Sequence, residues 1–204
     1  MSANYSSKRW RENEICSVSS RGVLLVLSGP GGVGKSTVVS ELKKFENFHF
    51  SVSATTRPPR PNEIDGVAYH FVDDQKFQKM IDNGDFLEWA QFAGARYGTP
   101  RKAVIDSLDS GKNVLLEIEI QGARQVKRAM PDAVMVFLAP PSIEELESRI
   151  IGRGTDSPER ISARLALAHE ELAAAGEFDH MITNHRVEDV VGALVSLATA
   201  VRGN

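Results

Sequence analysis

The chain has 204 residues, of which 42% are hydrophobic and 25% charged, and its formal net charge is −3 at pH 7. These values are typical of one soluble globular domain with insertions, and the slightly acidic balance argues against a broad surface for nucleic acid or an anionic membrane. The single cysteine, Cys16, excludes an internal disulfide and is compatible with a reducing cytosol. We therefore expect a cytoplasmic protein in which any anion site is built from local groups of arginines.

Residues 1–21 are polar and rich in serine, and we expect them to form a disordered N-terminal extension. They contain no apolar run of signal-peptide length, and no later segment reaches the roughly twenty apolar residues of a membrane helix. Residues 22–204 are expected to form one domain.

A Gly-rich loop follows the first apolar run of the chain, 23–27, which is predicted to be a buried strand. The loop, 29–36, reads Gly-Pro-Gly-Gly-Val-Gly-Lys-Ser, and a helix-compatible segment, 37–44, comes directly after it. This order is typical of a P-loop, in which backbone N–H groups and the positive end of a helix hold phosphates. We predict that Lys35 reaches the β- and γ-phosphates of ATP and that Ser36 ligates Mg²⁺. The predicted ATP-binding residues of the loop are Gly29, Pro30, Gly31, Gly32, Val33, Gly34, Lys35, Ser36 and Thr37.

The block 51–100 interrupts the alternation of strands and helices. Three closely spaced prolines make a stiff turn near its start. Its predicted elements are strands at 67–71 and 86–92 and a helix at 74–82. We interpret the block as a small mixed α+β subdomain inserted between core segments 22–50 and 101–204.

Beyond the insert, apolar runs again alternate with helical segments, which predicts an α/β fold with a parallel sheet flanked by helices, as in P-loop NTPases. The expected strands lie at 113–119, 133–138 and 179–183, and the expected helices at 121–130, 142–151, 158–175 and 187–202. Ser142 with Glu145 three residues on, and Ser157 before a proline, are helix-capping patterns. Glycine, proline and arginine together in 152–158 predict a mobile lid at about 149–164 that carries charge onto a ligand.

Several short motifs stand in a fixed order along the chain. Besides the P-loop they are Phe-Ser-Val-Ser-Ala-Thr-Thr-Arg-Pro-Pro-Arg at 50–60, Gly-Val-Ala-Tyr-His-Phe at 66–71, Phe-Leu-Glu-Trp-Ala at 86–90, Arg-Tyr-Gly-Thr-Pro at 96–100, Gly122, Ala-Pro-Pro-Ser at 139–142 and Ile-Gly-Arg-Gly-Thr at 151–155. Their order resembles guanylate kinase, a family of nucleoside monophosphate kinases, over about 22–201. The resemblance implies transfer of the γ-phosphoryl group of MgATP to GMP and dGMP, giving the diphosphate and ADP.

Arg57 and Arg60 stand three residues apart on the proline-stiffened turn. Two guanidinium groups suit a doubly charged monophosphate, because arginine binds phosphate through two parallel hydrogen bonds. The resemblance implies that Tyr69 and Tyr97 help these arginines to hold the GMP phosphate. The alternative is a solvated basic loop.

Glu88 interrupts an otherwise apolar and aromatic strand. A carboxylate can accept hydrogen bonds from both N1–H and the 2-amino group of guanine, and such a site rejects a base without those donors. The resemblance implies that Ser53 and Thr99 also contact the base. The alternative is an exposed charge on an edge strand.

Glu117 and Glu119 lie at the carboxyl end of a predicted strand, where alternation would put them on one face. The family often has aspartate here. The resemblance implies that Glu119 contacts the guanine amino group and that Glu117 supports Mg²⁺ or an arginine through water. The alternative is a buried ion pair with Arg124 or Lys35.

Arg149, Arg153 and Arg164 match the arginines that neutralise the transferring phosphoryl group in the family, and Asn184 matches a position near the ATP base. The five histidines show no metal-ligand spacing. Transfer to a phosphate oxygen that is already anionic needs no general base, so positioning and positive charge would carry catalysis.

Two rivals remain open at the level of sequence. A ribose bisphosphate kinase of related architecture would use the P-loop and the arginines but not Glu88. A non-catalytic guanylate-kinase-like binding module would have lost catalysis, although Lys35 and Ser36 are intact here. Monomer and homo-oligomer are equally compatible with the sequence.

Overall fold

The computed structural model describes residues 21–92, 94–152 and 157–200. The extension expected at 1–21 therefore lies outside the described residues, apart from Arg21. Within the described ranges, no helix combines the length and the hydropathy that crossing a membrane requires.

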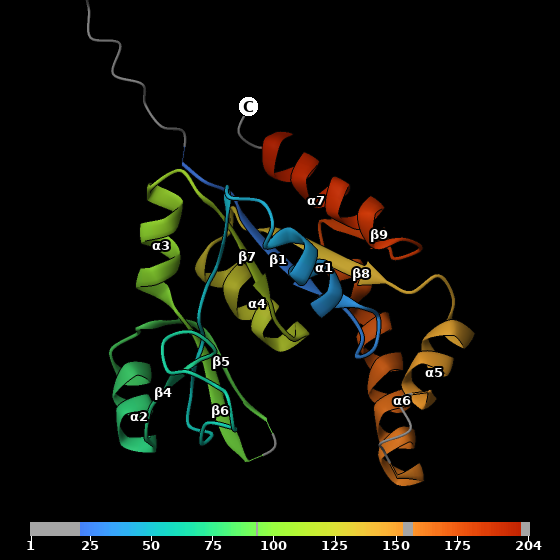
Figure 1. Cartoon of the computed structure of the whole chain (residues 1–204), viewed down its shortest axis with the longest axis horizontal. Coiled ribbons are helices and arrows are strands. Elements are labelled where there is room, and N and C mark those ends of the chain that lie inside the picture. The colour runs from blue at the N-terminus through green and yellow to red at the C-terminus, as the bar shows by residue number, and fades with distance from the viewer. Residues whose placement is uncertain (1–20, 93, 153–156, 201–204) are drawn as a thin grey trace, which may run out of the picture.

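Five parallel strands form the core sheet and confirm the predicted fold class (Figure 1). Their order is β2-β7-β1-β8-β9, and every neighbouring pair is parallel. The strands are β1 (Leu24–Ser28), β2 (Phe48–Phe50), β7 (Asn113–Glu117), β8 (Val134–Ala139) and β9 (His180–Thr183). The Gly-rich loop leaves the carboxyl end of the central strand β1, where ligands bind in open α/β sheets.

Helices cover both faces of this sheet (Figure 1). They are α1 (Lys35–Leu42), α3 (Arg101–Asp109), α4 (Ile120–Ala129) and α7 (Val187–Ala200). Leu25 and Leu27 of β1 pack in one cluster with residues of α1 and α7. Leu24 and Val26 point to the opposite face and pack with residues of α3 and α4. Each of these buried side chains contributes about 2 kcal/mol to folding, and together they hold the central strand and its loop in place.

The insert forms a second sheet of order β4-β3-β6-β5 with one helix. Its elements are β3 (Ala54–Thr55), β4 (His70–Phe71), α2 (Asp74–Asp82), β5 (Phe86–Phe92) and β6 (Ala95–Pro100). The sheet is mixed: β3 is parallel to β4 and antiparallel to β6, and β5 is antiparallel to β6. The strand expected at 67–71 is reduced to two residues, because a turn closed by the Val67 and Ala68 N–H groups on Ile64 O precedes it.

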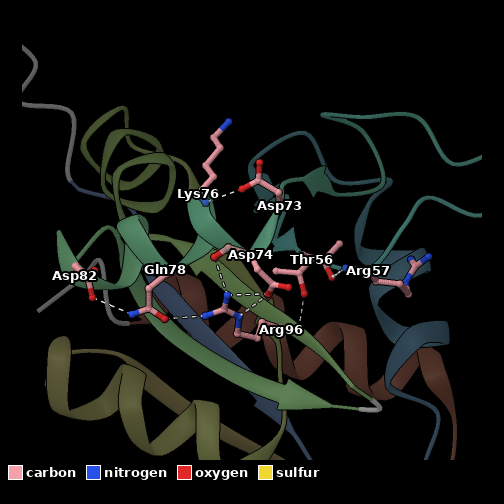
Figure 2. A network of polar contacts seen from close by, with 9 residues as sticks. Thr56, Arg57, Asp73, Asp74, Lys76, Gln78, Asp82 and Arg96 are labelled. Atoms are coloured by element: carbon pink, nitrogen blue, oxygen red, sulfur yellow. Dashed lines mark hydrogen bonds and ion pairs between the residues drawn. The ribbon is translucent and has the colours of Figure 1, made fainter.

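Arg96 of β6 fastens α2 to the insert sheet (Figure 2). Its guanidinium donates to Asp74 Oδ1 at 2.8 Å and to Gln78 Oε1 at 2.9 Å. Its backbone N–H donates to Thr56 Oγ1 at 2.9 Å. Arg57 projects away from this network in Figure 2. Arg96 therefore stabilises the segment from which Arg57 emerges.

Gln125 of α4 joins the insert to the core. Its amide accepts from the Trp89 N–H at 3.1 Å and donates to the Trp89 carbonyl at 2.9 Å. Trp89 lies on β5, the edge strand of the insert sheet, so the amide pairs with backbone groups that would otherwise be exposed.

A helical pair, α5 (Ile143–Ile151) and α6 (Pro158–Ala173), projects from the core opposite the insert (Figure 1). Ser142 and Ser157 cap these helices as expected, each accepting from the backbone N–H three residues on. The helix expected at 158–175 ends at Ala173 and continues as the 3-10 turn η1 (Ala174–Glu177).

Candidate active site

The Gly-rich loop is shaped to hold an anion. Gly29 and Gly34 have φ angles of 145° and 104°, and a Cβ on Gly29 would lie 2.3 Å from the Leu138 carbonyl oxygen. Gly34 is the N-cap of α1, and no side chain caps that helix. The first N–H groups of α1 and the positive end of its dipole therefore face the loop, as a phosphate site requires.

Lys35 lies over this loop, where backbone carbonyl groups accept its hydrogen bonds. Its Nζ donates to the Gly29 carbonyl and, at 3.3 Å, to the Pro30 carbonyl. Arg124 instead pairs with Glu177. The alternative of a buried ion pair between Glu117 or Glu119 and these two cations is therefore wrong, because both carboxylates are exposed.

Ser36 and Glu117 bring two hard oxygen groups together beside the loop. The Ser36 hydroxyl donates to Glu117 Oε1 at 3.1 Å, and both side chains reach solvent. Mg²⁺ in nucleotide sites takes one or two protein oxygens and keeps waters and substrate phosphates as its other ligands. The donor set therefore fits the predicted ion. No larger His, Cys, Asp and Glu cluster that could hold a metal occurs within the described ranges.

Glu119 lies beyond the strand on which it was predicted. Strand β7 ends at Glu117, and Glu119 is the N-cap residue of α4. The prediction that Glu117 and Glu119 lie on the same face of one strand is therefore wrong, because the chain leaves the sheet after Glu117 and starts a helix. Glu119 instead lies close to Glu171 of α6 and, after burial, helps to raise the pKa of that carboxyl group.

Glu171 places a carboxylate on the Gly-rich loop, a role that the sequence did not reveal. It is 6% exposed, and its Oε2 accepts from the Gly31 N–H at 3.1 Å. Burial, with the hydrogen bond and charge of Glu119, raises the pKa of Glu171 to about 7, against the opposing effects of Gly31 and Lys35. A backbone N–H of the loop thus donates to an internal carboxyl group.

The free energy of unfolding of the ligand-free chain is expected to depend on pH through Glu171. Its folded pKa of about 7 lies above the ordinary value of 4.5, so the folded state binds this proton more tightly. The stabilisation is complete below about pH 4.5 and is lost as the pH rises through 7, by about 1 kcal/mol between pH 6 and pH 8. Glu171→Gln cannot ionise and should lack this loss.

Urea unfolding of both proteins at pH 6 and pH 8 measures this difference. Glu170→Gln, which changes an exposed neighbour on the same helix, should follow the parent chain. Equal pH slopes for the parent and Glu171→Gln would contradict the expectation.

Arg149 and Asn184 approach the loop from two other elements. Arg149 donates to the Val33 carbonyl at 3.3 Å and also pairs with Glu145. Asn184 is buried, and its amide donates to the same carbonyl at 2.8 Å. Its side chain therefore supports the P-loop backbone. Arg164 lies half-buried on α6, and Arg153 falls outside the described residues.

The predicted acceptor-phosphate residues gather on the insert. Arg57 lies over the ring of Tyr69, with 5.4 Å between its Cζ and the ring centroid, and Tyr69 contacts Tyr97 edge to face. Arg57 is further held by Glu63 through two hydrogen bonds, whereas the Arg60 side chain is exposed. The alternative of a solvated basic loop thus describes Arg60 but not Arg57.

Glu88 is buried, so the alternative of an exposed edge-strand charge is wrong. It is 7% exposed, and Thr99 donates to its Oε1 at 2.5 Å. A register irregularity between Phe86 and Glu88 and the covering helix α4 account for this burial. A Cβ on Gly122 of α4 would lie 2.8 Å from Glu88 Oε2, so glycine there makes room for the carboxylate. Burial raises the pKa of Glu88, and the Thr99 hydrogen bonds oppose this shift.

A cavity of about 180 Å³ opens between the core sheet and the insert. Predicted site residues line it from both sides: Ser53, Tyr69, Thr99 and Glu117. Ser51 lines it as well, and its buried Oγ has no hydrogen-bond partner among the described residues. Ser51 was not among the predicted site residues, because a serine in a short polar segment carries no signal of its own.

Comparisons with known proteins agree on one family. The family model described as guanylate kinase matches residues 21–201. A guanylate kinase of Streptomyces kasugaensis is 61% identical over 175 residues, which are 85% of each chain. One of Streptomyces coelicolor is 58% identical over 179 residues, 87% of this chain and 91% of the relative. The crystal structure of guanylate kinase from Anaplasma phagocytophilum superposes with a TM-score of 0.71 at 35% identity, covering 91% of this chain and 88% of that one.

Proposed function

This chain belongs to the guanylate kinase family, and from that membership we propose that its site transfers the γ-phosphoryl group of MgATP to GMP and dGMP, giving ADP and the diphosphate. The proposal assigns the Gly-rich loop to ATP and the cavity beside the insert to the acceptor. The chain is a phosphotransferase, as its relatives are.

Glu88 is the residue that best supports guanine as the base of the acceptor nucleotide. A buried carboxylate costs free energy unless donors satisfy it, and the Thr99 hydroxyl donates to Oε1 of Glu88. The N1–H and 2-amino groups of guanine supply two more, whereas the matching edge of adenine does not. Thr99, the partner of Glu88, lines the cavity beside the insert together with the hydroxyl groups of Ser53 and Ser51. A guanine would therefore add hydrogen bonds to a carboxylate that burial otherwise disfavours.

Positioning and positive charge are proposed to carry the chemistry. The attacking oxygen belongs to the acceptor phosphate and is already anionic, so no general base is needed. Lys35, Arg149, Arg164 and Arg153 are the proposed cations around the transferring group, of which Lys35 and Arg149 contact the loop carbonyls. Ser36 and Glu117 are the proposed protein groups for Mg²⁺, which neutralises charge on the β- and γ-phosphates when bound.

The rate of ADP release with different acceptors tests the proposal. With GMP, AMP, dTMP and CMP at equal concentration, we expect the rate with GMP to exceed the others by at least about 10²-fold, because the wrong bases leave the buried carboxylate unpaired. A preference for any base other than guanine would overturn the acceptor assignment.

The same assay separates the two rivals. A ribose bisphosphate kinase would ignore all four nucleotides, and a non-catalytic module would in addition fail to bind ATP at millimolar concentration. The guanylate kinase name of the Streptomyces relatives and the intact contacts of Lys35 and Ser36 favour the kinase of GMP. Cytoplasmic localisation and the oligomeric state stay predictions.

A further inference from the structure

Arg57, the proposed ligand of the acceptor phosphate, is held by a carboxylate that the sequence motifs did not single out. Glu63 Oε2 accepts from Arg57 NH1 at 3.0 Å, and Glu63 Oε1 accepts from NH2 at 2.8 Å. The two side chains are only 16% and 20% exposed. Such a two-bond pair fixes the plane and direction of a guanidinium as well as its charge.

The same carboxylate closes the turn that carries the second proposed ligand. Glu63 Oε2 also accepts from the Arg60 N–H at 2.7 Å, and the Glu63 N–H donates to the Arg60 carbonyl at 3.1 Å. Asn62, inside the turn, has a φ of 72°, which asparagine tolerates better than most residues. One side chain thus connects both arginines of the motif.

Glu63 uses only one edge of the Arg57 guanidinium. The second hydrogen of NH1 goes to the Pro58 carbonyl at 2.7 Å. Neither contact uses Nε–H or the second hydrogen of NH2, which together form the side edge of the group. Tyr69 and Phe71 lie against the guanidinium, with centroids 5.4 Å and 5.8 Å from Cζ. The hydrogen bonds to Glu63 are the main cause that raises the pKa of Arg57, and Tyr97 adds to this shift. The guanidinium therefore stays charged, and its side edge, which Glu63 does not use, can meet a phosphate.

We propose that Glu63 is a positioning residue that aims the side edge of Arg57 at the phosphate of the acceptor nucleotide. Arginine has a long, flexible side chain, so a site that has ordered it beforehand binds phosphate more tightly. Arg57 in turn lowers the pKa of Glu63, which keeps this carboxylate ionised at neutral pH. The inference rests on the proposed role of Arg57 in binding the acceptor.

Steady-state kinetics of Glu63→Ala test the inference. We expect the KM for GMP to rise about tenfold, whereas kcat and the KM for ATP stay within twofold, because the phosphoryl-transfer groups are untouched. Glu63→Asp keeps the charge and should recover part of the loss. Asp109→Ala, which removes an exposed ion pair with Arg21, is the matched control and should leave all constants unchanged. Glu63→Gln keeps the side-chain size and replaces Glu63→Ala if that variant does not fold.

A double-mutant cycle shows whether Glu63 acts through Arg57. In an Arg57→Ala background, adding Glu63→Ala should change the KM for GMP by less than twofold. A tenfold effect that persists there would overturn the inference, because Glu63 would then act only by closing the turn at Arg60.

The remaining outcomes are also decisive. An unchanged KM for GMP in Glu63→Ala overturns the inference, and a lower KM does so as well, since Glu63 would then compete with the phosphate. If Arg57→Ala raises the KM but Glu63→Ala does not, the inference fails and the proposed function stands. If Arg57→Ala has no effect, the phosphate assignment fails together with the inference.

Discussion

Replacement of Lys35 by methionine is expected to lower kcat on the order of 10³-fold. Lys35 Nζ is held over the Gly-rich loop by the Gly29 and Pro30 carbonyls, so its charge is not neutralised by a carboxylate hydrogen bond there. Loss of a single neutral donor to developing charge costs about 10²–10³ in rate, and charged donors are roughly twice as strong. Methionine keeps the length of the side chain and removes only the charge and the donors.

Single-turnover rates at saturating ATP and GMP measure this effect directly. Lys44→Met is the matched control, because Lys44 is exposed, lies just beyond the same helix and forms an ion pair with Glu41. We expect the control to keep the parental rate. A rate for Lys35→Met within threefold of the parent would remove Lys35 from the proposed catalytic residues.

Replacement of Glu88 by glutamine is expected to lower kcat/KM for GMP by about 10²–10³. Hydrogen bonds to a charged acceptor contribute about 1.5–3 kcal/mol each, and the proposed site makes two of them with guanine. The amide of glutamine also presents a donor where the base needs an acceptor. The KM for ATP should stay within twofold, and the preference for GMP over AMP should fall in proportion.

The stability of this variant distinguishes lost recognition from lost folding. Burial raises the pKa of Glu88, which means that the site disfavours its charge, so the neutral glutamine should leave the free energy of unfolding unchanged or higher. Glu188→Gln on the exposed start of α7 is the control and should change neither quantity. An equal loss of activity with every acceptor would contradict the role in base recognition.

Local patterns predicted most of the core. The apolar run before the loop, the glycines and the following helix are contiguous, so their P-loop arrangement follows from neighbouring residues alone. Helix caps at Ser142 and Ser157 were predictable for the same reason. The short strands β2 and β3 were not, because two or three residues carry too little periodicity and pair only when a distant strand is present.

The residues of the candidate site also fall into those that local motifs predicted and those that they did not. The motif arginines and the loop were found in the sequence, whereas the partner of Arg57 was not, since Glu63 resembles any charged loop residue. Glu171 was missed because it lies 140 residues from Gly31, the donor that it meets. Because the two residues are so far apart in the chain, no local sequence pattern could predict their contact.

The linear chain was sufficient to predict the residue types of both proposed anion sites, since phosphate chemistry requires particular groups at particular spacings. Folding in three dimensions decided which carboxylates are buried. Glu88 became a buried acceptor because β6 supplies Thr99 and α4 supplies Gly122. The pKa of Glu171 is raised because α6 buries this carboxyl group and brings it close to Glu119. Burial and proton affinity depend on neighbours from distant segments, and only the packed structure brings those segments together.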